Sequence, residues 1–107
     1  MAPAWAAIES LTRTLAGELG SFGIRVICLR ADGISETAAI DEVFSLHAAG
    51  AGMSSREEFQ SLMENRTLLG RLPKLSEVAN TAVFIASDQA SAMTGTVVNV
   101  SCGSVVD

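Results

Sequence analysis

The pattern of apolar and polar residues predicts two β-strands separated by helices. Residues 3–19 place apolar side chains, Ile8 and Leu11 among them, three or four positions apart, which is the spacing of one helical stripe. Residues 26–29 are all apolar, the pattern of a strand that is covered on both faces. Residues 96–100 are rich in β-branched side chains and predict a second short strand.

Three helices are predicted between the two strands. Residues 35–37 lead into a helical apolar pattern that is interrupted at residues 50–52 by glycines. Either Ser54 or Ser55 can open the next helix, because each has a Glu three positions later in a capping box. Ser76 is the expected N-cap of a longer helix that leads to the second strand.

This order of elements predicts an α/β fold in which the strands belong to a doubly wound parallel sheet. A parallel sheet of two strands has two open edges and needs helices on both faces. We therefore expect the chain to be the edge portion of a larger sheet, completed by residues upstream or by another chain. Ligands of such sheets bind at the carboxyl ends of strands, so the loop at residues 31–34 is the first candidate site.

Composition and charge narrow the function classes. The 107 residues form one domain at most, and with 49% hydrophobic and 18% charged residues they predict a buried core. A net charge of −5, one Trp and no Tyr argue against nucleic acid and against an anionic membrane surface as partners. Cys28, Cys102 and His47 lack metal-ligand spacing, so no metal site is expected. Without a signal peptide or an apolar span, the expected location is cytoplasmic.

Several segments carry a resemblance to a known family. They are residues 5–20, 23–26, 69–73, 77–79, 84–88, 93–95 and 98–100. In this order they resemble the long helix, the penultimate strand and the closing section of short-chain dehydrogenases/reductases, which are Rossmann-fold NAD(P)-dependent oxidoreductases. The resemblance implies that residues 1–107 are the C-terminal segment of one Rossmann domain, with residues 35–67 as a lid-like helical excursion.

Two catalytic positions of that family hold other residues in this chain. In register, Met1 stands at the catalytic tyrosine and Trp5 at the catalytic lysine. A thioether and an indole have no proton to exchange near neutral pH, so no catalytic residue is assigned here. The family's glycine-rich phosphate loop and catalytic serine are also absent from the sequence. We therefore expect no dinucleotide binding and no catalysis by this chain alone.

The resemblance places the loop after the first strand on the nicotinamide side of an NAD or NADP site. The implied cofactor-binding residues are Ala31, Asp32, Gly33, Ile34 and Thr37, although Glu36 takes the family's strict threonine position. Asp32 would bring a carboxylate near the cofactor, and a plain turn role is the equal alternative. The implied lid residues are Phe44, His47, Phe59 and Met63, which face either a substrate or the core. Core packing is the alternative that their helical spacing favours.

Two functions remain open. The first is part of an NAD(P)-dependent oxidoreductase that transfers hydride to or from an alcohol or carbonyl substrate. The second is a non-catalytic relative or subunit-interaction module, which the changes at Met1 and Trp5 favour. The family's interfaces imply a homo-oligomer, dimer or tetramer, or the N-terminal half of the same domain as partner. The substrate and the choice between NAD and NADP do not follow from these residues.

Overall fold

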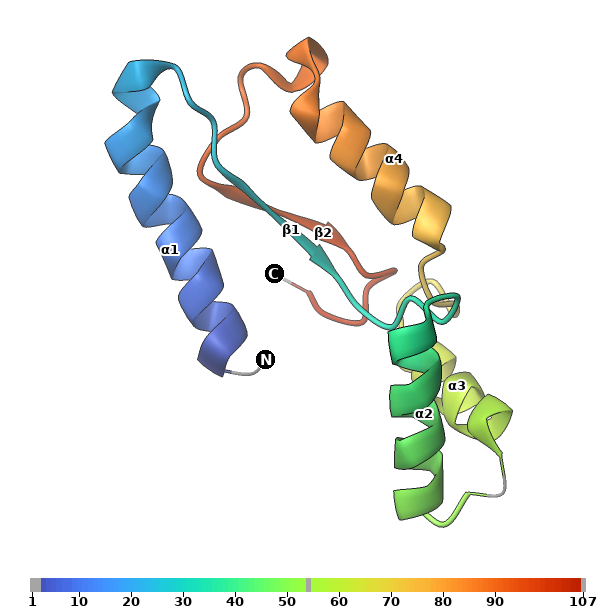
Figure 1. The fold of residues 1–107 in the computed structure, drawn as a ribbon. Coiled ribbons are helices and arrows are strands. Elements are labelled where there is room, and N and C mark those ends of the chain that lie inside the picture. The colour runs from blue at the N-terminus through green and yellow to red at the C-terminus, as the bar shows by residue number, and fades with distance from the viewer. Residues whose placement is uncertain (1–2, 54, 107) are drawn as a thin grey trace. The chain divides into compact units, whose positions relative to one another are not determined.

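A computed structural model describes residues 3–53 and 55–106 of the chain (Figure 1). The elements in chain order are α1 (Pro3–Leu19), η1 (Gly20–Phe22), β1 (Ile27–Ala31), α2 (Ala38–Gly50), α3 (Arg56–Asn65), α4 (Leu75–Ala86), η2 (Asp88–Ala90) and β2 (Thr96–Val100). β1 and β2 pair in parallel in a two-stranded sheet. The predicted order of helices and strands is thus confirmed.

The chain divides into two compact units, which are described separately. Unit 1 consists of Met1–Arg30 and Asn80–Val98, and it holds α1, most of β1, the second half of α4 and most of β2. Unit 2 consists of Ala31–Ala79 and Asn99–Asp107, and it holds the loop after β1 together with α2 and α3.

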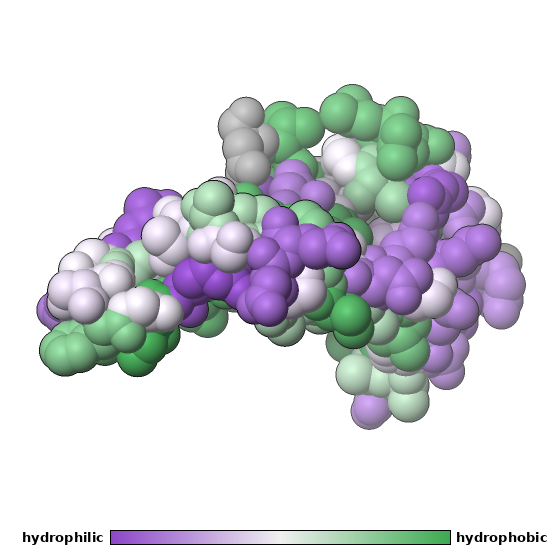
Figure 2. All heavy atoms as spheres, turned by 90° about the horizontal axis from the view of Figure 1, so that it is seen from above, coloured by the Kyte–Doolittle hydropathy of each residue, from purple (hydrophilic) through white to green (hydrophobic). Residues whose placement is uncertain are grey.

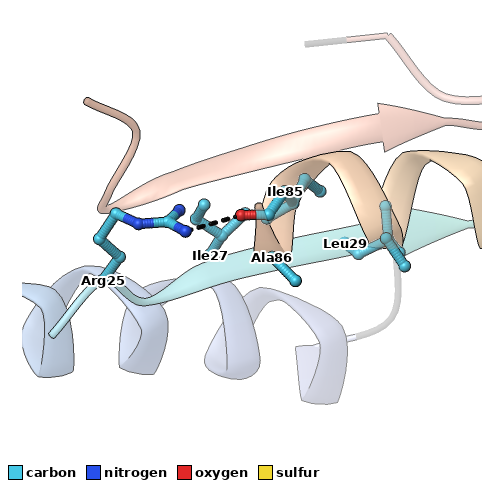
Figure 3. A pocket seen from close by; sticks show the side chains of 6 residues that line it. Arg25, Ile27, Leu29, Ile85 and Ala86 are labelled. Atoms are coloured by element: carbon cyan, nitrogen blue, oxygen red, sulfur yellow. Dashed lines mark hydrogen bonds between the residues drawn. The ribbon is translucent and has the colours of Figure 1, made fainter. Parts of the chain in front are cut away.

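In unit 1, alternate residues of β1 face two different helices. Ile27 and Leu29 line a groove with the second half of α4, and Figure 3 shows this groove from close by. Arg30 has the opposite parity, and its Nη1 lies 2.6 Å from Oε1 of Glu9 on α1. Successive side chains of a strand point to opposite faces, so α1 and α4 cover opposite faces of β1. The apolar run at residues 26–29 predicted this cover.

The side chain of Arg25 binds the carboxyl end of α4. Its Nη2 donates to the carbonyl oxygens of Ile85, at 2.9 Å, and Ser87, at 3.4 Å, while Nη1 donates to that of Met93 at 3.4 Å. Figure 3 shows the first of these bonds. The last carbonyls of a helix lack partners within the helix and carry the negative end of its dipole. Arg25 therefore caps α4 from the segment that precedes β1.

The face that α1 buries differs from the predicted apolar stripe. Ile8 and Leu11 are 54% and 53% exposed, whereas Thr12 and Ala16 are buried. A Cβ built on Gly95 would lie 3.4 Å from the Cβ of Ala16, so α1 approaches the chain closely at a glycine. Small residues permit this close contact, while Ile8 and Leu11 stay at the surface and Leu15 and Leu19 are half-buried.

In unit 2, α2 and α3 pack against each other through aromatic rings. Phe44 is buried, and its ring lies 5.3 Å from that of Phe59 in a T-shaped arrangement, the geometry that aromatic pairs prefer. Ala48 and Leu72 are buried too. The Ser55 hydroxyl accepts from the Glu58 N–H at 3.2 Å, which confirms Ser55 as the N-cap of α3 that one of the two predicted capping boxes assigned. The other, at Ser54, lies outside the described residues.

The predicted cap of α4 is wrong. The helix begins at Leu75, so Ser76 lies inside its first turn. The Leu75 N–H donates instead to Oε1 of Glu36, at 2.7 Å, and the Lys74 N–H donates to Oε1 of Glu77, at 2.8 Å. Carboxylates bind helix N-termini more strongly than a hydroxyl does, because the charge interacts with the helix dipole.

Large apolar side chains remain exposed in both units, and Figure 2 shows apolar residues at the surface beside polar ones. The most exposed ones, each 66% or more, include Phe22, Leu46, Leu68, Leu69 and Val83. None of the helices described in the structure has the length and apolar character needed to cross a bilayer. Exposed apolar area of this kind is typical of surfaces that contact another polypeptide.

Arg71 and Glu77 form a bidentate ion pair at the start of α4. The two nitrogen–oxygen distances are 2.7 and 2.8 Å. The hydrogen bond from Arg71, supported by the one from the Lys74 N–H, lowers the pKa of Glu77 from 4.5 to about 2. Because the folded-state pKa is depressed, this interaction stabilises the fold above the unfolded pKa and is lost as pH falls toward 2.

We predict that Glu77→Gln removes part of the acid destabilisation of the full chain. The melting temperature of the wild-type chain should fall between about pH 4.5 and 2, and the variant should lose less over this window. Thermal unfolding across pH 2–7 measures the difference. Glu18→Gln, at an exposed position of α1, is the control and should keep the wild-type pH dependence. Parallel curves for Glu77→Gln and wild type would contradict the prediction.

We also predict that Arg25→Met destabilises the full chain by about 2 kcal/mol, the range for hydrogen bonds to a charged group. The carbonyl oxygens that Arg25 binds would lose their donor, and methionine has none to offer. Urea unfolding measures the change. Arg13→Met, at an exposed position of α1, should shift stability by no more than about 0.5 kcal/mol. Equal effects of the two substitutions would refute the capping role.

Candidate functional site

The candidate loop connects the end of β1 at Ala31 to α2 and lies in unit 2. Gly33, in the middle of this loop, is buried and has a φ of +59°. A Cβ at this position would lie 3.3 Å from Cδ2 of Leu72 and 3.6 Å from Cζ of Phe44. Glycine is therefore required here both by the left-handed backbone and by the close packing of the loop.

Asp32 connects the loop to the segment after β2. Its Oδ2 accepts a hydrogen bond from the Ser104 hydroxyl at 3.0 Å, and its side chain is half-buried. A carboxylate has two oxygens and several lone pairs, so one bond leaves it able to accept others. Ser104 was not among the residues that the sequence singled out, since no local pattern relates it to a residue 72 positions away.

Thr37 uses its hydroxyl within the loop. The hydroxyl donates to the Ile34 carbonyl at 2.9 Å and accepts from the Ile40 N–H at 3.4 Å, which makes Thr37 the N-cap of α2. The Thr37 N–H also donates to the Ile34 carbonyl, at 3.0 Å. Glu36, at the family's strict threonine position, is committed to the start of α4. The side chain of Thr37 therefore fixes the shape of the loop.

Two backbone donors of the loop remain available. Within the part of the chain that the structure describes, the N–H groups of Gly33 and Ile34 donate no hydrogen bond. They follow each other directly after the carboxyl end of β1. Successive free N–H groups of this kind can bind a carbonyl oxygen or an anion.

The predicted lid residues lie on α2 and α3. His47 is exposed and stacks on Phe59 with ring centres 5.6 Å apart, while its Nδ1 lies 2.8 Å from the Val43 carbonyl oxygen. Phe44 belongs to the packed interior of unit 2, and Met63 is half-buried. The structure thus brings His47, Phe59 and Phe44 together.

A hollow of about 390 Å³ opens beside this aromatic pair. Its lining residues are Leu46, His47, Gly50, Ala51 and Phe59. The lining is apolar apart from the imidazole, so the hollow can take an apolar group. Leu46 was not predicted to line a site, because its position lies off the predicted apolar face of α2. In the folded chain its side chain is 66% exposed.

Trp5, which the resemblance places at the family's catalytic lysine position, offers no acid–base group. Trp5 lies in the first turns of α1 and is 52% exposed, and Met1 lies outside the described residues. Among the described residues there is also no group of three or more His, Cys, Asp or Glu side chains that could hold a metal ion. The backbone N–H groups of the loop and the carboxylate of Asp32 can form hydrogen bonds with a ligand.

Comparison with known proteins identifies relatives across nearly the whole chain. The family described as "Enoyl-(Acyl carrier protein) reductase" matches residues 1–104. Secoisolariciresinol dehydrogenase of Forsythia intermedia is 39% identical over 90 residues, which are 83% of this chain and 30% of that protein. The NADH-dependent enoyl-[acyl-carrier-protein] reductase of Haemophilus influenzae is 34% identical over 103 residues, 96% of this chain and 35% of its own length. The chain thus spans about a third of these relatives.

Solved structures show the same fold. A short chain dehydrogenase family protein from Francisella tularensis superposes with a TM-score of 0.84 at 27% identity, over 92% of this chain and 40% of that one. Sorbitol-6-phosphate 2-dehydrogenase from Erwinia amylovora gives 0.83 at 28% identity, over 92% and 38%. These neighbours confirm the predicted fold class, a Rossmann-like α/β fold with a parallel sheet. The chain belongs to the short-chain dehydrogenase/reductase family.

Proposed function

We propose that this chain supplies the nicotinamide-side loop and the lid of an NAD(P)-dependent oxidoreductase that transfers hydride to or from an alcohol or carbonyl substrate. Residues 1–107 are then the C-terminal segment of a single Rossmann domain, and residues 35–67 are its lid-like excursion. One observation carries the proposal. Two adjacent N–H donors, of Gly33 and Ile34, are available at the carboxyl end of β1, where open α/β sheets bind their ligands.

The groups of the loop fit the carboxamide of a nicotinamide ring. The N–H groups of Gly33 and Ile34 can donate to its carbonyl oxygen, and the carboxylate of Asp32 can accept from its amino group. Thr37 acts as a positioning residue, because its hydroxyl holds the Ile34 carbonyl. Ala31 ends the strand and sets where the loop begins. Bound NAD or NADP would supply the hydride acceptor or donor.

The relatives include one named for NADH and one solved with NADP, so the proposal covers both cofactors. The name of the Haemophilus influenzae relative specifies NADH. The N-domain of a bacterial malonyl-CoA reductase was solved with NADP, and it is 28% identical with a TM-score of 0.76 over 95% of this chain. The hollow beside His47 and Phe59 is apolar, which supports a role for these lid residues, with Phe44 and Met63 behind them, against an apolar part of the substrate.

The second candidate is a non-catalytic relative or subunit-interaction module. Trp5 supports it, because an indole at the family's lysine position can neither lower the pKa of a neighbouring acid nor transfer a proton. Cofactor binding by backbone N–H groups does not need that lysine. A non-catalytic relative can therefore retain or lose dinucleotide binding, whereas the oxidoreductase requires it.

Binding of a dinucleotide tests the proposal. We expect the complete polypeptide that contains this chain to bind NADH or NADPH saturably by nucleotide fluorescence. The N–H groups of Gly33 and Ile34 should then exchange with deuterium about tenfold more slowly, as groups that gain a hydrogen bond do. The 107-residue chain alone should bind neither, because it lacks the phosphate-binding loop.

The controls distinguish an error in the role of the loop from an error in the proposed function. Exchange at the Ala82 N–H, in the middle of α4, should not respond to either nucleotide. Saturable binding without protection of Gly33 and Ile34 would refute the assigned role of the loop. Failure of the complete polypeptide to bind either nucleotide would refute the oxidoreductase and favour the interaction module.

Assembly with a further polypeptide is the last part of the proposal. Trp5, Ile8 and Leu11 on α1 are each more than half exposed, which supports a covering partner on this helix. The partner is a second copy, in a dimer or tetramer, or the remainder of the same Rossmann domain. Sedimentation velocity should show a homo-oligomer of the complete polypeptide at micromolar concentration. A monomer throughout this range would contradict the homo-oligomer.

A further inference from the structure

One side chain of unit 2, that of Arg56, contacts three separate segments. Its Nη2 donates to the Ser35 carbonyl oxygen at 3.0 Å, and its Nη1 donates to Oε1 of Gln60 at 2.5 Å. It forms an ion pair with Asp41, and its guanidinium carbon lies 5.7 Å from the centre of the Phe44 ring. Among the described residues, Arg56 is the one whose side chain joins α3 to the 32–37 loop by a hydrogen bond.

These contacts connect the candidate loop to the two lid helices. Ser35 lies in the loop, Asp41 is in the first turn of α2, and Gln60 lies one turn along α3 from Arg56 itself. The amide of Gln60 in turn donates to Oε1 of Glu64 at 3.0 Å, which extends the network along α3. The planar guanidinium can make these bonds simultaneously, because its five N–H donors point in fixed directions.

The covalent connection between α2 and α3 does not fix α3 in the same way. The turn that joins the helices contains Gly52 with a φ of +73°, and a Cβ built on this glycine meets no atom within 4 Å. Packing of Phe59 on Phe44 holds α3 to α2, and Cζ of Phe44 also lies near Gly33 of the loop, but this contact is apolar and non-directional. The hydrogen-bonded link from α3 to the loop is made by Arg56, whose side chain is only 20% exposed.

We propose that Arg56 is a positioning residue that couples the 32–37 loop to α3. A change in the loop is transmitted to α3 through the hydrogen bond to the Ser35 carbonyl, and a change in α3 reaches the loop by the same bond. The coupling is a property of the chain without any ligand. If the loop binds a dinucleotide as proposed above, the same bond makes cofactor binding and lid order interdependent, since linkage between two sites is reciprocal.

Hydrogen exchange of the full chain measures the coupling. Thr37→Ala removes the N-cap of α2 and a hydrogen bond to Ile34, so exchange in the loop and at the start of α2 should rise. With Arg56 present, we expect exchange of the α3 amides, Phe59 to Glu64, to rise about threefold as well. In the Arg56→Lys background, Thr37→Ala should leave α3 exchange unchanged. A lysine keeps a charge near Asp41 but lacks the fork that reaches two oxygens.

A merely structural role for Arg56 would give a different result. Loss of packing alone would raise α3 exchange in Arg56→Lys and would let Thr37→Ala act on α3 equally in both backgrounds. That outcome would overturn the proposal. The matched control is Arg66→Lys at the C-cap of the same helix, where Thr37→Ala should still raise α3 exchange.

A second variant covers the case in which Arg56→Lys fails to fold, as judged by exchange of the α1 amides. Asp41→Asn removes the ion pair and retains the hydrogen bond from Arg56 to Ser35. We expect the effect of Thr37→Ala on α3 to persist in Asp41→Asn. Its disappearance there would show that the pathway runs through the ion pair to α2 and would refute the role of the Ser35 bond.

Discussion

The need to cover both faces of β1 determines the arrangement of unit 1. A parallel strand with apolar side chains on successive positions must have helices on both sides, because each face would otherwise meet water. Ile27 and Leu29 meet α4, while Arg30 extends to Glu9 on α1. Arg30 and Glu9 are 10% and 15% exposed, so their charges are largely removed from solvent and depend on each other. Unit 1 therefore tolerates little change in the position of α1 against β1.

Both ends of α4 are capped by residues far away in the sequence. Glu36, 39 positions before Leu75, binds the first turn, and Arg25, 60 positions before Ile85, binds the last. The two caps have the signs that the helix dipole favours, an anion at the N-terminus and a cation at the C-terminus. None of the residues of α4 is buried, so the helix lacks a deep apolar face that would fix its position. The charged contacts at its two ends therefore contribute strongly to its placement.

Local sequence patterns predicted the elements that depend on interactions between residues close together in the chain. Apolar spacing predicted α1, the strands and the two lid helices, and the serine–glutamate spacing at Ser55 predicted the start of α3. Ser76 failed as a cap because the competing carboxylate of Glu36 comes from another segment, which no local spacing reveals. The role of Arg56 was missed for the same reason, since one of its partners, the Ser35 carbonyl, is 21 residues away. The family resemblance indicated the loop as a candidate site, but it did not predict that the Thr37 hydroxyl would bind the Ile34 carbonyl within the loop.

In the proposed site, the groups that would bind the cofactor differ in kind from the groups that would transfer a proton. The donors available to a ligand, the N–H groups of Gly33 and Ile34, belong to the backbone, so they persist whatever side chains surround them. Their placement depends on Gly33, which the left-handed φ and the contact with Leu72 require. Proton transfer, by contrast, depends on a few side chains, whose acidic or basic groups no backbone atom can replace. In the proposed function, cofactor recognition by the loop is thus separable from catalysis, and the structure of the loop constrains only the first.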